Sequence, residues 1–333
     1  MNRVRSLYVV VLLGVVISLT LTPPPAVAQN KISRFLTDEG EPPMSAVIGY
    51  IPLSPDSALV VDNTDSIFLI ISDRRERLLG QKGGGSCEHQ QVTSYTLAGD
   101  TLFVLDTQLG RITGYSIHTG ECLKEVVMPE LAQFSQIEKN GNWFYLAKAN
   151  YNSSDPPDEP LLYRLGSEGD LLPLALTIED LDADLLLLPF KVGQRVNTIK
   201  PRGNKLYFIL PFSHRIWQYD TETKLFSSFN LKNESAKIAK YSSSTDFEEV
   251  AKLVPRLEIE LDLFLLEDRV IVLSIFQNQY RLRSYSYSGD LIAEEKDVQH
   301  VYFHERENLY SLVSTNSDTE IYAIELVNFF SVR

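Results

Sequence analysis

Short runs of apolar and aromatic residues alternate with turn residues along most of the chain. TLFVLD follows Gly99-Asp100, and KLYFIL follows Gly203-Asn204 in the same way. If the Asp or Asn of each turn is taken as a marker, the phrase recurs at positions 65, 100, 142, 204, 268 and 308. Runs rich in Val, Ile, Tyr and Phe after Gly-Asp or Gly-Asn turns are typical of strands joined by tight turns. The pattern therefore predicts six copies of one β unit.

A second β-rich stretch follows several of these runs after a polar loop. Examples are residues 111–123, 160–172, 215–226 and 280–292. Two consecutive hairpins form a four-stranded antiparallel sheet with two apolar faces, and radial stacking around an axis covers both. We therefore expect an all-β fold, a six-bladed β-propeller with four-stranded antiparallel blades. The first copy lacks a clear second hairpin after Arg74–Gly80, so three strands are the alternative there.

The domain boundaries follow from the extent of the repeats. Propeller repeats take roughly 40 to 45 residues, so residues 45–333 accommodate a single six-bladed domain with room for extra segments. Those segments fall at residues 177–188 and 232–257. In the second segment, Thr245 and Glu248 predict the capping box of a short helix. Because an open ring leaves strand edges unpaired, we expect Ser45–Leu53 to pair with the final strand, Glu320–Leu326, and join the chain ends.

The first 28 residues have the organisation of a signal peptide. Arg3 and Arg5 precede the apolar run Leu7–Leu21, and Ala26-Val27-Ala28 supplies a cleavage site. An uncleaved anchor is the alternative, but the run is shorter than the roughly 20 residues that span a membrane. We expect an exported protein, periplasmic or extracellular, with a linker at residues 29–44 and no integral membrane segment in the mature chain.

Composition and charge narrow the class of partner. A hydrophobic content of 44% is that of a folded protein. The chain has 31 basic and 44 acidic residues, a net charge of −13. Nucleic acids bind clustered Lys and Arg, and the densest cluster, Arg74, Arg75 and Arg77, is interrupted by Glu76. We therefore expect no nucleic-acid partner.

The chain has two cysteines, Cys87 and Cys122. An exported protein with an even cysteine count predicts a disulfide between them, and two free thiols are the alternative. Neither cysteine belongs to a CxxC pattern or a Cys/His cluster, so the sequence predicts no zinc site.

Several phrases resemble one family. They are the strand phrase Gly99–Asp106, the following Arg111-Ile112 and Tyr115, the turn Thr119-Gly120, and the Gly-rich stretch Gly80–Glu88. Together they resemble the NHL-like six-bladed β-propellers, especially exported bacterial members of uncharacterised function. In that family a Gly-rich stretch ending in Glu links one blade to the next; here the usual Pro is missing and Cys87 intrudes. The resemblance implies a fold rather than an activity, since propellers include lactonases, lyases and binding scaffolds.

Ligands of propellers usually bind the face where the loops between second and third strands meet the interblade loops. We predict that this ligand face carries Asp73, Arg74, Asp106, Asn152, Asp155, His214, Arg215 and Asn278. For the aspartates, hydrogen bonds to nearby backbone in turns are the alternative role. Asp62, Asp65, Asp73 and Asp106 also end strands or turns and are the candidates for a divalent cation such as calcium, which requires six to eight oxygen ligands.

No local catalytic motif is present, so catalytic residues stay unassigned and no cofactor is expected. His300 and His304 are four apart in a β-rich run, and a strand separates them by roughly 13 Å, too far to share one ion. The sequence favours a scaffold that binds a protein, peptide or glycan. The alternatives are a metal-dependent enzyme of the lactonase or lyase kind with its site in the central channel, and a sensory ectodomain.

Overall fold

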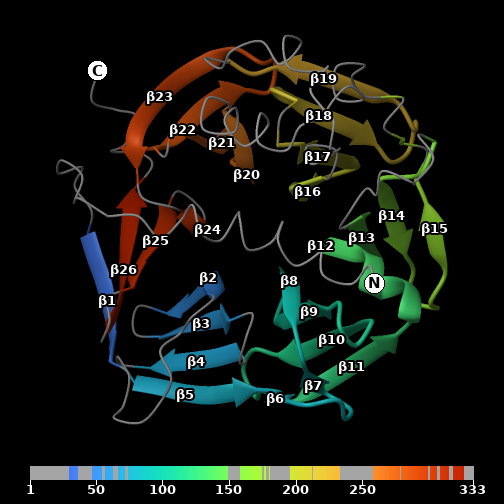
Figure 1. The fold of residues 1–333 in the computed structure, drawn as a ribbon, viewed down its shortest axis with the longest axis vertical. Helices are drawn as coiled ribbons and strands as arrows, with labels where there is room; N and C mark the ends of the chain where they lie inside the picture. The colour runs from blue at the N-terminus through green and yellow to red at the C-terminus, as the bar shows by residue number, and fades with distance from the viewer. Residues whose placement is uncertain are drawn as a thin grey trace, which may run out of the picture.

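The chain forms a ring of β-sheets. A computed structural model describes residues 30–36, 47–54, 57–62, 67–71, 74–148, 158–174, 176–177, 180, 196–211, 213–232, 258–277, 279–298, 301–305, 308–314 and 318–325. Within these residues, six four-stranded antiparallel sheets are arranged as blades around a central axis (Figure 1). The predicted six-bladed β-propeller is confirmed.

The first three blades follow one another in chain order. Blade 1 contains β2 (Val47–Ser54), β3 (Ser57–Asp62), β4 (Ile67–Ile71) and β5 (Arg74–Leu79). Blade 2 contains β8 (Val92–Ala98), β9 (Thr101–Asp106), β10 (Arg111–Ser116) and β11 (Cys122–Val127). A 3₁₀ turn, η2 (Pro129–Gln133), leads to blade 3, which contains β12 (Phe134–Asn140), β13 (Trp143–Lys148), β14 (Leu162–Leu165) and β15 (Leu171–Pro173).

The remaining blades complete the ring. Blade 4 contains β16 (Thr198–Arg202), β17 (Lys205–Ile209), β18 (Arg215–Asp220) and β19 (Phe226–Asn230). Blade 5 contains β20 (Ile259–Leu265), β21 (Arg269–Phe276), β22 (Gln279–Ser286) and β23 (Leu291–Val298). Blade 6 contains β24 (Val301–Glu305), β25 (Asn308–Ser314), β26 (Asp318–Glu325) and, as its outermost strand, β1 (Asn30–Leu36).

Both chain ends contribute to blade 6, but not through the segment expected from the sequence. β1 pairs antiparallel with β26, with Asn30 opposite Ala323 and Leu36 opposite Asp318. The pairing of Ser45–Leu53 with the final strand is therefore wrong, because β2 pairs with β3 inside blade 1. Residues 30–36 are a strand rather than part of a linker. β1 covers the outer edge of β26, so this edge is not left unpaired. The need to pair strand edges is the reason for which the sequence predicts closure.

Blade 1 has the four strands expected of every blade, and the three-strand alternative is wrong, because β5 pairs with β4. Its marker, however, differs from expectation. The marker at Asp65 precedes the third strand of this blade, whereas the other five markers precede second strands. In blade 1 the corresponding turn lies before Ser57. Turn residues occur at both places, so the local pattern did not distinguish them.

Apolar side chains from adjacent blades pack together to form the core. Leu105 and Ile112 of blade 2 share a buried cluster with Phe134 and Phe144 of blade 3. Between blades 4 and 5, Ile209 packs with residues such as Leu263 and Val272. Leu206, Phe208 and Ile209 of blade 4 are all buried, and a strand buried on both faces explains why a run such as KLYFIL is almost continuously apolar. The ring is thus held by interblade burial of apolar surface.

Turns between first and second strands contact one another on the face opposite the ligand face. Gly99 and Gly203, which have φ of 58° and 59°, occupy such turns because a glycine adopts positive φ without strain. Nδ2 of Asn140 donates to the carbonyl of Gly203 at 2.8 Å. In the next pair of blades, Nη2 of Arg202 donates to the carbonyl of Glu267 at 2.6 Å. Equivalent turns therefore link successive blades.

Candidate functional site

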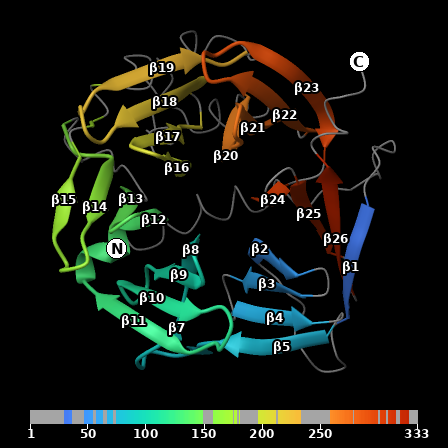
Figure 2. The ribbon, with the colours of Figure 1, turned by 180° about the vertical axis from the view of Figure 1, so that it is seen from behind.

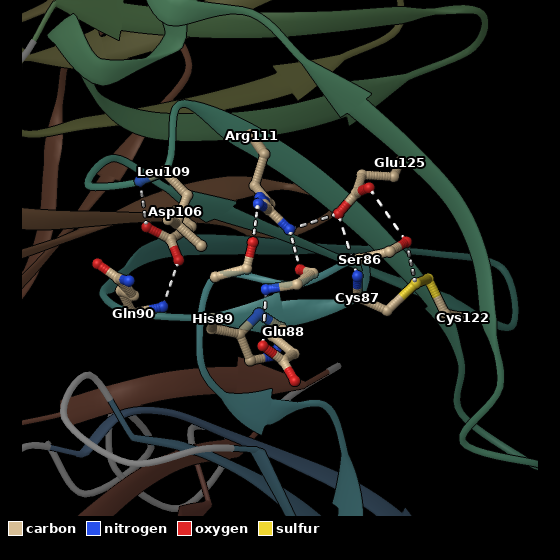
Figure 3. Close-up of polar contacts among 12 residues, drawn as sticks. Ser86, Cys87, Glu88, His89, Gln90, Asp106, Leu109, Arg111, Cys122 and Glu125 are labelled. Atoms are coloured by element: carbon tan, nitrogen blue, oxygen red, sulfur yellow. Dashed lines mark hydrogen bonds and ion pairs between the residues drawn. A yellow bond between two sulfur atoms is a disulfide. The ribbon is translucent and has the colours of Figure 1, made fainter.

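A Gly-rich segment, residues 80–91, links β5 of blade 1 to β8 of blade 2 and lies on the rim of the ring. It contains the short strands β6 (Gln81–Lys82), labelled in Figure 1, and β7 (Glu88–His89), labelled in Figures 1 and 2; the two strands pair in parallel. Arg111 of β10 fixes this loop: Nη1 donates to the carbonyl of Gly85 at 2.6 Å, and Nη2 to that of Gly84 at 3.2 Å (Figure 3).

Glu125 of β11 connects Arg111 to the loop. Its Oε1 lies 2.7 Å from Nη1 of Arg111 and accepts a hydrogen bond from the backbone N–H of Cys87 at 3.1 Å. Its Oε2 accepts from Oγ of Ser86 at 3.4 Å. A charge-assisted pair that also satisfies backbone groups gives a loop a defined position. The loop is therefore a built part of blade 2 and not a loose connection.

Cys87 and Cys122 form a disulfide, so the structure contains no free thiol within its described residues. Cys87 has φ of 59°. Beneath it, the hydroxyl of Tyr115 donates to the carbonyl of Cys87 at 2.9 Å and lies 3.2 Å from Nε2 of His89. Burial raises the pKa of Tyr115 above its ordinary value, so this hydroxyl keeps its proton.

A pocket of about 370 Å³ lies between the loop and the outer hairpin of blade 2. Its lining residues come from two chain segments that the disulfide joins; they are Gly80, Gln81, Ser86, Cys87, Glu88, Tyr115, Gly120 and Cys122. Gln81 and Ser86 are exposed, so the pocket opens to solvent at the rim.

Asp106, a predicted ligand-face residue, is instead buried at the end of β9. Its Oδ2 accepts hydrogen bonds from the backbone N–H groups of Gln90 at 2.6 Å and Gln91 at 3.3 Å. Its Oδ1 accepts from that of Leu109 at 3.0 Å. The alternative role, hydrogen bonding to nearby backbone, is the correct one. Asp106 anchors the Gly-rich loop to blade 2 and is 0% exposed, which removes it from any ligand or cation site on the surface.

A second set of polar side chains lies around the axis, on the innermost strands of blades 2 to 5. Oγ1 of Thr96 in β8 donates to Oε2 of Glu138 in β12 at 2.9 Å. Nζ of Lys200 in β16 donates to Oε1 of the same carboxylate. Asp262 in β20 interacts electrostatically with Lys200. We call Thr96, Glu138, Lys200 and Asp262 the axial cluster; it joins side chains from four consecutive blades.

The axial cluster is partly accessible and electrostatically coupled. The side chains of Lys200 and Glu138 are 30% and 15% exposed. Burial by itself lowers the pKa of Lys200, but Glu138 and Asp262 together raise it above the ordinary value, so the ammonium stays charged. Burial raises the pKa of Asp262. It also raises that of Tyr95, whose ring packs close to Gly49 of blade 1.

A third cluster joins the loop between β17 and β18 to the start of β20. Nδ1 of His214 lies 2.7 Å from Oε1 of Glu260, and the carbonyl of Pro211 accepts from the backbone N–H of Glu260 at 2.9 Å. Glu260 is 1% exposed, and its Oε2 has no hydrogen-bond partner among the described residues. Burial raises the pKa of the Glu260 carboxyl, and Glu258 adds to the effect, although His214 opposes it.

The backbone of His214 is in the left-handed region, with φ of 49°. Non-glycine residues rarely adopt this conformation, and those that do frequently lie at functional sites. Close by, Glu258 pairs with Nη1 of Arg283 at 2.6 Å and accepts from Oγ of Ser274 at 2.8 Å. The structure thus places His214 on the predicted face, where the loop of one blade meets the inner strand of the next.

The other predicted ligand-face residues are only partly described. Arg215 donates from Nε to Oδ1 of Asn230 at 3.1 Å and lies over the ring of Trp217. Arg74 begins β5. The remaining residues lie outside the described part of the chain, as does the predicted helix after Thr245; they are Asp73, Asn152, Asp155 and Asn278. Of the further cation candidates, Asp65 lies outside it as well. His304 lies in β24, the strand expected for it.

Sequence reasoning missed the axial cluster, although the sequence contains a signal for it. Thr96, Glu138 and Lys200 each lie four residues before the markers at 100, 142 and 204. Residues that are equally far from equivalent turns lie at the same height along neighbouring innermost strands, so their side chains can meet. Asp262 lies six residues before its marker at 268, because the first strand of blade 5 extends further.

Two general features of the described residues bear on the type of site. No three His, Cys, Asp or Glu side chains in the described ranges lie close enough to hold a metal ion together. Across those same ranges, no helix has the length and apolar character needed to cross a membrane.

Comparison with known structures supports the fold. A protein of Bacteroides fragilis NCTC 9343 whose structure is described as that of an exported protein has a TM-score of 0.59 and 11% identity, covering 89% of this chain and 94% of its own. A structure of YCF48 bound to D1 peptide has a TM-score of 0.51 and 8% identity, covering 91% and 85%. Comparison with curated proteins gives no match.

One family covers most of the chain. The family described as 6-bladed beta-propeller matches residues 47–279, which span blades 1 to 4 and the first two strands of blade 5. The order of strands in these blades is the same in each, with the innermost strand first and the outermost last. The chain therefore belongs to the 6-bladed beta-propeller family.

Proposed function

We propose that this protein is an exported binding scaffold that recognises a protein, a peptide or a glycan. The observation that carries the proposal is the axial cluster, in which four blades place Thr96, Glu138, Lys200 and Asp262 together. A ring of packed sheets holds these groups in fixed positions. A few fixed polar groups on a rigid frame are what a binding site uses to orient a ligand.

The chemistry of the cluster suits recognition. Lys200 keeps its charge and has N–H groups beyond the one that contacts Glu138. Glu138 is held by both Thr96 and Lys200. A ligand with hydroxyl, amide or charged groups finds donors and acceptors here without any rearrangement of the blades. A net charge of −13 favours approach of a neutral or basic ligand.

Two further observations guide the choice of partner and compartment. The fold neighbour YCF48 is described in complex with a D1 peptide, so a peptide is a reasonable first probe for a ring of this fold. The N-terminal segment has the three regions of a signal peptide, and a fold neighbour is described as exported. Both support export of this chain.

The proposal is tested by screening the purified mature chain against peptide and glycan arrays and measuring affinity for each hit. Lys200→Gln removes the axial charge, and Lys124→Gln removes an exposed lysine of the outer strand β11 as a matched control. Loss of a charge-assisted hydrogen bond is expected to weaken binding by about tenfold or more. The control should bind within about twofold of the parent.

Two results would contradict the proposal. One is the absence of any array hit. The other is a hit whose affinity is the same in the parent and Lys200→Gln, with circular dichroism confirming that the variant is folded.

A further inference from the structure

The pocket beside the Cys87–Cys122 disulfide is a second candidate site, separate from the axial cluster. It lies between the Gly-rich loop and the outer hairpin of blade 2, whereas the axial cluster lies on β8, β12, β16 and β20, the innermost strands of their blades (Figure 1). A volume of about 370 Å³ is at the small end of the range for ligand pockets. It suits a single side chain or a small molecule.

The walls of the pocket are fixed by contacts already described. The disulfide joins the Gly-rich loop to the start of β11, and Tyr115 supports Cys87 from below. At Gly80, with φ of 64°, an added Cβ would lie 2.3 Å from Nε2 of His89 and 2.9 Å from the hydroxyl of Tyr115. The backbone at residue 80 therefore lies directly against the polar floor, which a side chain there would disrupt.

The charge of the lining is negative. Glu88 is the one acidic side chain among the lining residues, and none of them is Lys, Arg or His. Oε2 of Glu88 accepts from the backbone N–H of Gly85 at 2.7 Å, which orients the carboxylate. Arg111, which fixes the loop, is engaged by Glu125 and by the carbonyl of Gly85.

The ligand class follows from this lining. One carboxylate falls far short of the six to eight oxygens that calcium requires. A guanidinium is planar, donates through several N–H groups and forms paired hydrogen bonds with a carboxylate. Oγ of Ser86 supplies an additional acceptor at the mouth of the pocket, while its proton is donated to Glu125. The negative net charge of the chain attracts such a cation.

We infer that this rim pocket binds the guanidinium of an arginine side chain presented by a partner protein, with Glu88 as its counter-ion. The disulfide joins the two walls of the pocket. This site adds a contact with a basic side chain of the partner to the proposed binding function, and it does not depend on the axial cluster.

The inference is tested with a capped tripeptide, acetyl-Gly-Arg-Gly-amide, titrated into the full mature chain and followed by NMR or calorimetry. The same peptide with citrulline is a neutral counterpart of nearly equal shape. Glu88→Gln keeps an oxygen that accepts from Gly85 but removes the charge, and Glu130→Gln on exposed η2 is the matched control. Because the ion pair would be partly exposed, we expect the parent to bind the citrulline peptide about fivefold more weakly than the arginine peptide. We expect Glu88→Gln to bind the arginine peptide about fivefold more weakly than the parent does.

The measurements have outcomes that support the inference and outcomes that overturn it. Binding of the arginine peptide that is weakened in Glu88→Gln, unchanged in Glu130→Gln and unchanged in Lys200→Gln supports it, whatever the arrays give for the axial cluster. No binding of the peptide at millimolar concentration, or equal binding of the citrulline peptide, overturns it. Cys87→Ser/Cys122→Ser should also lose binding while its circular dichroism stays that of a β-sheet protein; undiminished binding shows that the disulfide has no part in the site.

Discussion

Nδ1 of His214 lies 2.7 Å from Oε1 of Glu260, so a loop residue of blade 4 contacts a buried carboxyl group of blade 5. Burial raises the pKa of this carboxyl above its ordinary value of 4.5. A carboxyl with a raised pKa contributes stability in its protonated form. That contribution is fully present below the unfolded pKa and is lost as pH rises through the folded one.

This relationship predicts a pH-dependent difference in stability between the parent and Glu260→Gln. As pH rises above 4.5, the parent should lose stability relative to the variant, because the parent must ionise a buried group and the variant does not. Urea unfolding at several pH values between 4 and 8 measures the difference. Glu168→Gln, at an exposed position, should show no such trend. A difference that stays constant for Glu260→Gln contradicts the prediction.

Replacement of Arg111 by Met should destabilise blade 2. The change leaves Glu125 and the carbonyls of Gly84 and Gly85 without their shared donor. Removing one partner of a largely buried ion pair costs about 3 kcal/mol. Lys124→Met, at an exposed position of the adjacent strand, should change the free energy of unfolding by no more than about 0.5 kcal/mol. Similar values for both variants in urea unfolding would show that Arg111 does not fix the loop.

Removal of the disulfide should loosen the Gly-rich loop. Cys87 and Cys122 are separated by 35 residues, and a cross-link of that length stabilises a protein by roughly 3 to 4 kcal/mol through the entropy of the unfolded chain. Cys87→Ser/Cys122→Ser should lower the free energy of unfolding by about that amount. Trypsin should also cleave after the exposed Lys82 faster than in the parent. Equal cleavage rates would mean that Arg111 and Glu125 hold the loop without the disulfide.

Gly49→Ala should disturb the contact between blades 1 and 2. A Cβ on Gly49 would lie 2.2 Å from ring atoms of Tyr95, and forcing extra atoms into a packed site typically costs about 1 to 3 kcal/mol. In the Tyr95→Ala background the same change should cost much less, because the obstructing ring is gone. A double-mutant cycle measures this coupling; strictly additive effects would show that the two residues do not touch.

The sequence predicts the ring because its signals are local. Glycine turns such as Gly203-Asn204 and the apolar runs after them are read within a few residues, and they recur at blade length. The need to cover strand edges predicts that the ring closes, but the prediction that Ser45–Leu53 closes it is wrong. Because the residues after β1 are Pro-rich, the sequence predicts a linker at residues 29–44. No local pattern indicates that residues 30–36 pair with the last strand.

The candidate sites are harder to predict because their contacts connect distant residues. Lys200 meets Glu138 only after two blades have packed in a defined register. Asp106 ends a strand, which suggested exposure to a ligand, yet the backbone of Gln90 folds over it. The place of His214 in a loop predicts a position on the ligand face, whereas nothing local in β20 (IELDLFL) indicates that Glu260 is its partner.

Blade 6 takes its outermost strand from the beginning of the chain and its other three from the end. During synthesis, β1 is therefore made first and must wait for β26, which is made last. Blades 1 to 5 can assemble in order as they emerge, but the circle stays open until β26 has been made. The slowest step of folding should then be the docking of these two distant strands, and a truncated product lacking β26 should expose an unpaired strand that promotes aggregation.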